Sequence, residues 1–450
     1  MRILRICFPL VLIATSCDFR VGDDVPGSSS YGDPDSPPLP PEPPPSTMNP
    51  IPPVDGADLF RTPCAGSIDL FKELLVIDPA VLASSEARND VAGAAFSFRS
   101  RLEELSESAD DAARFAVEWL ESWKSTTQVG LVAAVQPRFD VENILVEPWK
   151  QAGGYGMSFL PFRLIAIVNR LDLASSADGC TGDAGEIRFV YTAVNPSLGN
   201  ALAMTVIVEV PYPSTRSPRA WADAWHALPS PASSSYVPAL AALVRDAMRD
   251  ADPERTRVRT NEIALGQSQN QPWELRQFAL MRADGQASLA PTLIATTPRD
   301  DLDGSSSLGA WIEDHRDRLA KGVTDALAIT MQAGASSMPE ANFRWTLASA
   351  VVPESVRHTF GLSTCNGCHG GERPADVLPF QHLAPGDAPN SAGYYDVRPT
   401  QRTRVSTFLY DGHGGGELVR RAQSMASILC SSCSPGPGSG VPPDSYPSCR

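Results

Sequence analysis

The chain has 450 residues, 42% of them hydrophobic, and a formal net charge of −15. This acidity, with no basic cluster longer than the pair Arg420 and Arg421, argues against a nucleic-acid partner or an anionic-membrane surface. The length supports one large domain or two smaller ones.

The N-terminus has the pattern of an export signal. Arg2 and Arg5 precede a short apolar run, 6–14, and small residues lead up to Cys17. Because this run is too short to cross a bilayer as a helix, we predict a cleaved signal peptide over 1–16. The ending Ala-Thr-Ser-Cys is similar to a bacterial lipoprotein signal, which implies lipidation of Cys17 and anchoring on the periplasmic side of the cell envelope. An ordinary secreted form is the alternative, and the choice between inner and outer membrane stays open.

Low-complexity segments flank the part of the chain that is expected to fold. Residues 17–58 are rich in proline, serine, glycine and aspartate, which predicts an extended tether behind the lipidated cysteine. The tail 434–450 has a similar composition and is predicted to be disordered. Between them we expect an α+β domain over 59–350 and a cysteine-containing C-terminal region over 351–433.

Apolar residues at spacings of three and four predict helices in the first part of the body. The expected helices are 67–75, 94–105 and 108–124. In the last of these, Phe115, Trp119 and Trp123 form an apolar stripe. Such a stripe indicates a helix that packs on a core rather than a cofactor site.

The middle of the chain changes to short β-branched segments bounded by Gly, Asn, Asp or Pro, which is the pattern of strands. Strands are expected at 163–169, 186–192, 203–210, 257–265, 273–282 and 289–296, with a hairpin turn at 283–285. Helices are expected at 218–228, 237–250, 311–320, 353–360 and 417–429. Because the strands do not alternate regularly with helices, we predict an α+β fold: a mixed or antiparallel sheet with packing helices, followed by a small irregular and helical Cys-rich C-terminal region.

Charged residues lie on or beside the expected strands. The carboxylates are Asp172, Asp183, Glu186, Glu209, Glu262 and Glu274, and the nearby arginines are Arg170, Arg188, Arg259 and Arg276. We interpret them as ion pairs across the sheet, with a carboxylate pair for acid–base catalysis as the alternative. The sequence has no glycine-rich phosphate loop, no Gly-x-Ser-x-Gly elbow and no His-Glu-x-x-His motif, so it assigns no catalytic residue.

One stretch has a pattern that predicts a specific chemistry. The run Cys365-Asn-Gly-Cys-His369 matches c-type haem attachment, in which two thiols bond the haem vinyl groups and the histidine binds the iron. In bacteria this attachment takes place outside the cytoplasm, which agrees with the export signal. We therefore predict haem c on Cys365 and Cys368 with His369 as the iron ligand. A disulfide or half of a zinc site is the alternative.

Several residues are candidates for the second axial ligand of the iron. His382 follows the motif in a loop that can fold over the ring, whereas Met425 lies at helical spacing and also fits a core position. His413 is a further candidate, and a five-coordinate iron is the remaining alternative. Methionine raises the reduction potential relative to a second histidine.

The other cysteines suggest disulfides in an oxidising compartment. Cys430 and Cys433 form a second Cys-x-x-Cys pair. We expect the pairings Cys64 to Cys180 and Cys430 to Cys433. A four-cysteine zinc or iron–sulfur site shared with the haem motif is the alternative.

A family resemblance rests on the order of several sequence blocks. These blocks are 162–173, 185–190, 259–265, 273–276 and 365–372. In this order the chain resembles a family of uncharacterised exported lipoproteins from myxobacteria and their relatives, over most of the folded body. The resemblance implies a lipoprotein context and a cysteine motif near the C-terminal end, and it implies no catalytic assignment.

Three functions fit these patterns. The first and favoured one is a membrane-tethered haem protein that transfers electrons to a redox protein partner. The second is a non-redox envelope lipoprotein or interaction module whose Cys-x-x-Cys pairs form disulfides or a structural zinc site. The third is a peroxidase-like enzyme with a five-coordinate haem, for which the sequence supplies no second catalytic group.

Overall fold

The structure is a computed structural model. It describes residues 59–432 except 63, 65, 131–132, 176–178, 263–272, 321–324, 339–342, 349–351, 373–380, 387–393, 396–402 and 411–415. The predicted signal peptide, Cys17 with its tether, His413, Cys433 and the C-terminal tail lie outside the described residues. Pro52–Arg450 is one compact unit by its contacts.

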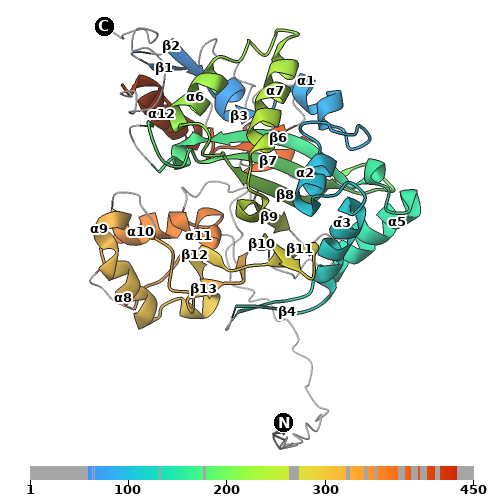
Figure 1. Cartoon of the computed structure of the whole chain (residues 1–450). Helices are drawn as coiled ribbons and strands as arrows, with labels where there is room; N and C mark the ends of the chain where they lie inside the picture. The colour runs from blue at the N-terminus through green and yellow to red at the C-terminus, as the bar shows by residue number, and fades with distance from the viewer. Residues whose placement is uncertain are drawn as a thin grey trace, which may run out of the picture. The chain divides into compact units, whose positions relative to one another are not determined.

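The main sheet confirms the predicted α+β class and is antiparallel between all of its paired strands (Figure 1). The strand order is β11-β10-β9-β8-β7-β6-β3, and β14 pairs with β10 beside this path. The bounds are β3 Leu75–Val76, β6 Phe162–Arg170, β7 Glu186–Val194, β8 Ala201–Pro211, β9 Arg257–Glu262, β10 Trp273–Ala283, β11 Gln286–Pro291 and β14 Ala335–Met338. The hairpin between β10 and β11 turns at Asp284 and Gly285, which both have positive φ as a tight two-residue turn requires.

Helices and short strands complete the described structure. The α-helices are α1 Pro79–Leu82, α2 Phe98–Ser106, α3 Ala112–Glu121, α4 Phe139–Val141, α5 Glu147–Gly153, α6 Pro218–His226, α7 Tyr236–Arg249, α8 Ser306–Asp314, α9 Arg316–Leu319, α10 Glu354–Ser363, α11 Cys365–Cys368 and α12 Glu417–Cys430. The remaining strands are β1 Leu59–Thr62, β2 Gly66–Asp69, β4 Thr127–Val129, β5 Ala133–Val135, β12 Ile294–Pro298, β13 Gln332–Ala333, β15 Leu383–Pro385, β16 Tyr394–Tyr395 and β17 Thr403–Ser406.

One face of the sheet packs against helices through aromatic side chains. Phe98 at the start of α2 lies 4.8 Å, between ring centroids, from both Phe162 on β6 and Tyr191 on β7. Trp119 of α3 meets Phe278 of β10 edge to face at 5.7 Å. This face is therefore a conventional hydrophobic core, and the aromatic stripe of α3 packs on it as predicted.

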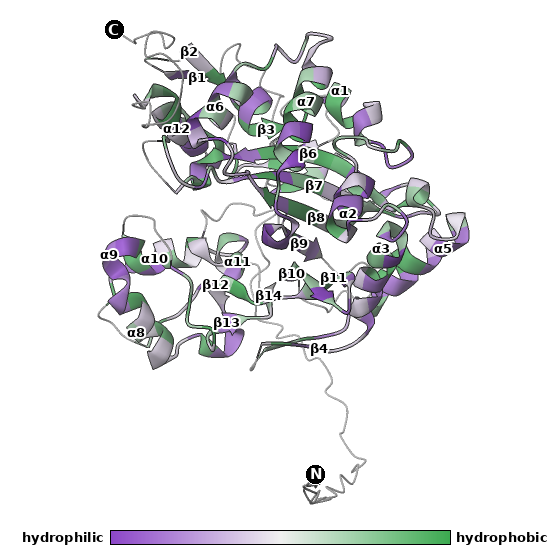
Figure 2. Cartoon of the chain, viewed as in Figure 1, coloured by the Kyte–Doolittle hydropathy of each residue, from purple (hydrophilic) through white to green (hydrophobic). Residues whose placement is uncertain are grey.

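The other face of the same sheet carries polar and charged residues. In the antiparallel register Arg188 of β7 lies opposite Glu209 of β8, and Ile207 of β8 lies opposite Arg259 of β9. Alternate residues of a strand share a face, so these side chains lie on the side away from the aromatic core. In Figure 2 the strands β6 to β8 are coloured largely hydrophobic and β9 is coloured hydrophilic.

The segment predicted as a helix over 67–75 is helical only in part. It begins within strand β2, which starts at Gly66 and pairs with β1, and Leu70–Leu74 forms a single π-helical turn. The Asp69 carboxylate accepts hydrogen bonds from the backbone N–H groups of Phe71 and Lys72. Asp69 therefore caps the helical turn, which begins only after the strand has ended. The spacing of the apolar residues does not show where the strand ends and the helical turn begins.

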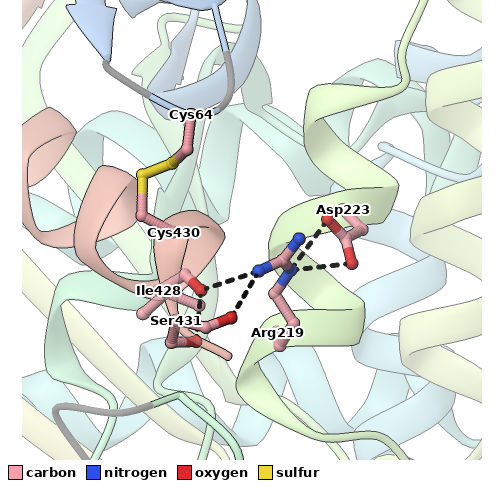
Figure 3. Close-up of a disulfide and its surroundings, with 6 residues drawn as sticks. All are labelled: Cys64, Arg219, Asp223, Ile428, Cys430 and Ser431. Carbon is pink, nitrogen blue, oxygen red and sulfur yellow. Dashed lines mark hydrogen bonds and ion pairs between the residues drawn. A yellow bond between two sulfur atoms is a disulfide. The ribbon is translucent and has the colours of Figure 1, made fainter. Parts of the chain in front are cut away.

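Helix α12 packs into the main core rather than forming a lobe of its own. Leu418, Met425 and Ile428 on this helix are buried in the same hydrophobic cluster as the sheet. Arg219 of α6 donates hydrogen bonds to the backbone carbonyls of Ile428 and Ser431, where α12 ends (Figure 3). A cation at this end also favours the helix dipole.

The disulfides differ from those predicted. Cys64 pairs with Cys430, with Cα atoms 5.6 Å apart, and this bond joins the β1–β2 segment to the end of α12 (Figure 3). Cys180 is also disulfide-bonded. The predicted pairings Cys64 to Cys180 and Cys430 to Cys433 are therefore wrong. Sequence spacing favoured the near pair, whereas the fold brings residues 366 positions apart together.

Candidate functional site

The predicted haem-attachment motif, Cys365–His369, forms a short helical turn directly after α10. Thr364 precedes this turn, and its hydroxyl accepts hydrogen bonds from the Gly367 N–H at 3.1 Å and from the indole N–H of Trp345 at 2.9 Å. The same hydroxyl donates to the carbonyl of Gly361 at 2.7 Å. The start of the motif is thus held by three hydrogen bonds to one buried side chain.

Gly367 allows the motif to pack closely against α10. A Cβ atom at this position would lie 2.3 Å from the carbonyl oxygen of Gly361. We expect Gly367→Ala to lower the free energy of unfolding by about 1–3 kcal/mol, because a backbone oxygen cannot move aside easily. Urea unfolding checks this, with Thr359→Ala on the exposed side of α10 as the control. Equal stability of the two variants would show that the motif tolerates a side chain here.

The end of the motif is tied to α10 by a buried charge network. Glu372 is fully buried, and its carboxylate accepts hydrogen bonds from Arg357, one of them at 2.8 Å. The ring nitrogen Nδ1 of His358 lies 3.0 Å from the same carboxylate. Arg357 also donates to the carbonyl of Trp345. This network holds the backbone on both sides of the motif.

Both motif cysteines are thiols rather than halves of a disulfide. The Cys365 side chain packs with Leu275 and Ile294 in a small buried cluster, and its N–H donates to the hydroxyl of Thr297 at 2.9 Å. Burial raises the pKa of the Cys365 thiol. The Cys368 sulfur lies 3.7 Å from Nε2 of His382. The predicted alternative of a disulfide within the motif does not describe this structure.

His369 and His382 lie side by side. Their rings stack with centroids 4.4 Å apart, and the other side of His382 stacks on Phe408 at 4.8 Å. Nδ1 of His382 lies 3.2 Å from the Ser406 hydroxyl on β17. The structure therefore brings the predicted iron ligand and one predicted second ligand together, although they are 13 positions apart in the sequence.

Met425 lies elsewhere. It is fully buried in the core between α12 and the sheet, among apolar side chains that include Leu418 and Leu429. It does not line the cavity beside His369 and His382. The structure does not bring this second candidate ligand to the motif.

A cavity of about 140 Å³ lies between the two histidines and the polar face of the sheet. Its apolar lining comes from several strands and the turns beside them, and it includes Leu75, Val168, Ile207, Leu275 and Leu409. The space is smaller than a typical ligand pocket of ~300 Å³ or more, and the histidine rings close one side of it. Because a haem is larger than this space, the side chains around it, His382 among them, would have to move for a haem to bind.

Charged residues form another part of the cavity wall, and those on β6 to β9 lie on the same face of the sheet as Val168 and Ile207. The Glu209 carboxylate lies between Arg188 and Arg259, at 3.1 Å from each guanidinium. Arg170 and Arg421 complete this wall. Burial and then the positive charge of Arg170 lower the pKa of Arg421 to about 9. The predicted ion pairs across the sheet are therefore present, and the sequence alone did not show that they face a cavity beside the motif.

Asp172 forms a buried ion pair with Arg170 beside the cavity, and this ion pair leads to a prediction about stability. Its buried carboxylate lies 2.8 Å from Arg170 and 3.2 Å from Arg420 of α12. Burial alone would raise the pKa of Asp172, but the hydrogen bond and charge of Arg170 hold it at about 2. Because this pKa is below the value of ~3.9 expected in the unfolded chain, the stabilisation is complete above pH ~4 and is lost as the pH falls through about 2.

We expect Asp172→Asn to lower the free energy of unfolding by about 2 kcal/mol at pH 7. The difference from the original protein should shrink as the pH falls from about 4 to 2. Urea unfolding across this pH range measures both quantities, and Asp90→Asn, at an exposed ion pair, is the control. A deficit that stays constant down to pH 2 would rule out the ionised carboxylate as its cause.

The zinc alternative loses one of its required ligands. Cys430 is bonded to Cys64 and so supplies no thiolate to a four-cysteine site. In the described part of the chain, no group of three or more His, Cys, Asp or Glu side chains is arranged to hold a metal ion. A single histidine with two thioether links does not need such a group, because haem brings four of the iron ligands itself.

The comparisons with known proteins add no relative. Among the described residues, no helix is long and apolar enough to cross a membrane. No protein-family model, no curated protein and no solved structure matches the chain.

Proposed function

We propose that this protein is an exported, lipid-anchored carrier of one covalently bound haem c, which it uses to exchange single electrons with a redox protein partner. Cys365 and Cys368 form the two thioether bonds, and His369 binds the iron. The lipid on Cys17 holds the protein at the periplasmic side of a cell-envelope membrane.

The observation that carries this proposal is the environment of the motif. His369 lines a cavity that also has apolar side chains and four arginines in its wall, and the two thiols lie in the helical turn that leads to His369. Haem is a flat apolar ring with two carboxylates on one edge, so the side chains present match its chemistry. The other cysteines with a described partner are disulfide-bonded, while the motif pair remains reduced.

His382 is the candidate for the second axial position. Its ring lies against His369, and the Cys368 thiol is one of its contacts. Thioether formation removes the thiol proton, and with it any hydrogen bond that this thiol donates to His382. Attachment therefore weakens the contact that holds His382 in the stacked position. When bound, haem supplies a reversible one-electron couple, and two histidine ligands give it a lower potential than histidine and methionine.

A spectroscopic titration tests the electron-carrier function. The full chain is expressed in a bacterial host together with a haem-maturation system, and the purified protein is titrated between oxidised and reduced forms. We expect a Soret band, reversible reduction with a single midpoint, and little turnover of hydrogen peroxide. Rapid peroxide turnover would instead favour the peroxidase alternative.

The variants His382→Ala and Met425→Leu identify the second ligand. We expect the first to change the spectrum and raise peroxide reactivity, because an axial position opens. The second should leave the spectrum unchanged, since Met425 is buried in the sheet core. The reverse pattern would assign the axial position to Met425.

A further inference from the structure

Arginines outnumber carboxylates among the residues that line the cavity. Three arginines of the sheet, Arg170, Arg188 and Arg259, and Arg421 of α12 line it, against one lining carboxylate, that of Glu209. Asp172, Glu186 and Glu417 pair with these arginines from positions outside the lining. The guanidinium groups are therefore balanced by carboxylates, and three of the four carboxylates lie behind the cavity surface.

Two further details show that this wall can accept a ligand. Arg421 is 8% exposed, and its depressed pKa reflects burial beside the like charges of Arg170 and Arg188. A bound anion would relieve that repulsion. Nε of Arg259, a donor, is buried and makes no hydrogen bond among the described residues, although the Glu209 carboxylate lies 3.1 Å from it.

We propose that this arginine wall, defined as Arg170, Arg188, Arg259 and Arg421, binds the two propionate carboxylates of the haem. This inference rests on the proposed function and deepens it. His369 and His382 line the cavity together with apolar side chains and the four guanidinium groups, so the site suits a ligand that is largely apolar and carries two carboxylates. The sheet contributes three of these arginines, and the C-terminal region contributes the motif and Arg421.

The test separates carboxylate recognition from covalent attachment. The full-length variant Cys365→Ala with Cys368→Ala binds iron porphyrins without forming thioethers, so affinities can be measured by optical titration. We compare iron protoporphyrin with its dimethyl ester, in which both propionates are neutral. We expect the ester to bind at least tenfold more weakly, because charge-assisted hydrogen bonds to carboxylates are lost.

Arginine variants in the same background locate the effect. Arg259→Gln and Arg421→Gln should each weaken binding of the free acid about tenfold and leave binding of the ester almost unchanged. Arg101→Gln, at a buried arginine outside this cavity, is the matched control. Arg259 is a third exposed, so its variant is expected to fold even where the Arg421 variant does not.

The possible outcomes distinguish a wrong assignment of the propionate site from a wrong proposed function. If the free acid and the ester bind equally, or the arginine variants lower both affinities alike, the propionate assignment is wrong while haem attachment stands. If succinate alone stabilises the thiol-free variant against heat and the arginines are needed for that effect but not for the ester difference, the wall is a site for a free carboxylate. If neither porphyrin binds and the original protein also gains no covalent haem, the proposed function fails together with this inference.

Discussion

Replacing Cys64 and Cys430 together with serine should lower the free energy of unfolding by about 4 kcal/mol. The disulfide joins residues 366 positions apart, so it restricts the unfolded chain strongly. It also fixes the end of α12, whose buried side chains complete the core under the sheet. Equilibrium unfolding in urea under oxidising conditions measures the loss.

Reduction provides the control for this disulfide. When a thiol reductant is added, the original protein should lose this amount plus what the Cys180 disulfide contributes, whereas the serine variant should lose only the contribution of the Cys180 disulfide. A serine variant as stable as the original protein would show that Cys64 and Cys430 do not pair. Mapping of disulfide-linked peptides then identifies the actual partners.

Replacing Arg357 with methionine should lower the free energy of unfolding by about 3 kcal/mol. Glu372 would then be fully buried without its guanidinium partner, and an uncompensated buried charge is strongly destabilising. Because Glu372 fixes the backbone just after His369, the yield of covalent haem should fall as well. Thermal unfolding and haem content per polypeptide measure the two effects.

A second substitution separates the charge effect from a loss of packing. Adding Glu372→Met to Arg357→Met removes both charges and should recover most of the stability. Glu354→Gln is the control, because Glu354 pairs with Arg357 at an exposed position. No recovery in the double variant would show that the pair is needed for its shape rather than its charge balance.

Local sequence patterns predicted a strand or helix correctly where a single pattern covers the whole element. β6 to β8 were expected because their β-branched runs are bounded by turn residues, and the structure has all three as neighbouring antiparallel strands. α6, α7 and α12 follow the expected apolar spacing closely. The segment 67–75 failed because a strand and a π-helical turn together imitate a helical spacing.

The candidate site was predicted in part. Cys365, Cys368 and His369 are contiguous, so the motif was visible, and His382 is near enough in sequence for a loop to return it. Cys64 and Cys430 are a long-range pair, and spacing carries no information about such pairs.

The arginine wall was missed for a different reason. Arg188, Glu209 and Arg259 were interpreted as ion pairs, which they form, but their shared face depends on strand register. A signal was present in the sequence. Arg188 lies between Ile187 and Phe189, and Arg259 lies between Val258 and Thr260, all four of them buried, so the two arginine side chains needed a polar environment within the fold.

The central claim is covalent haem on Cys365 and Cys368. The most direct measurement is the mass of the denatured protein, with peptide mapping, after expression of the full chain with a haem-maturation system. The account predicts one added haem on the peptide that contains residues 365–369, and none in the variant with alanine at both cysteines. A wild-type mass equal to the polypeptide alone, with both motif thiols still open to alkylation, would contradict it.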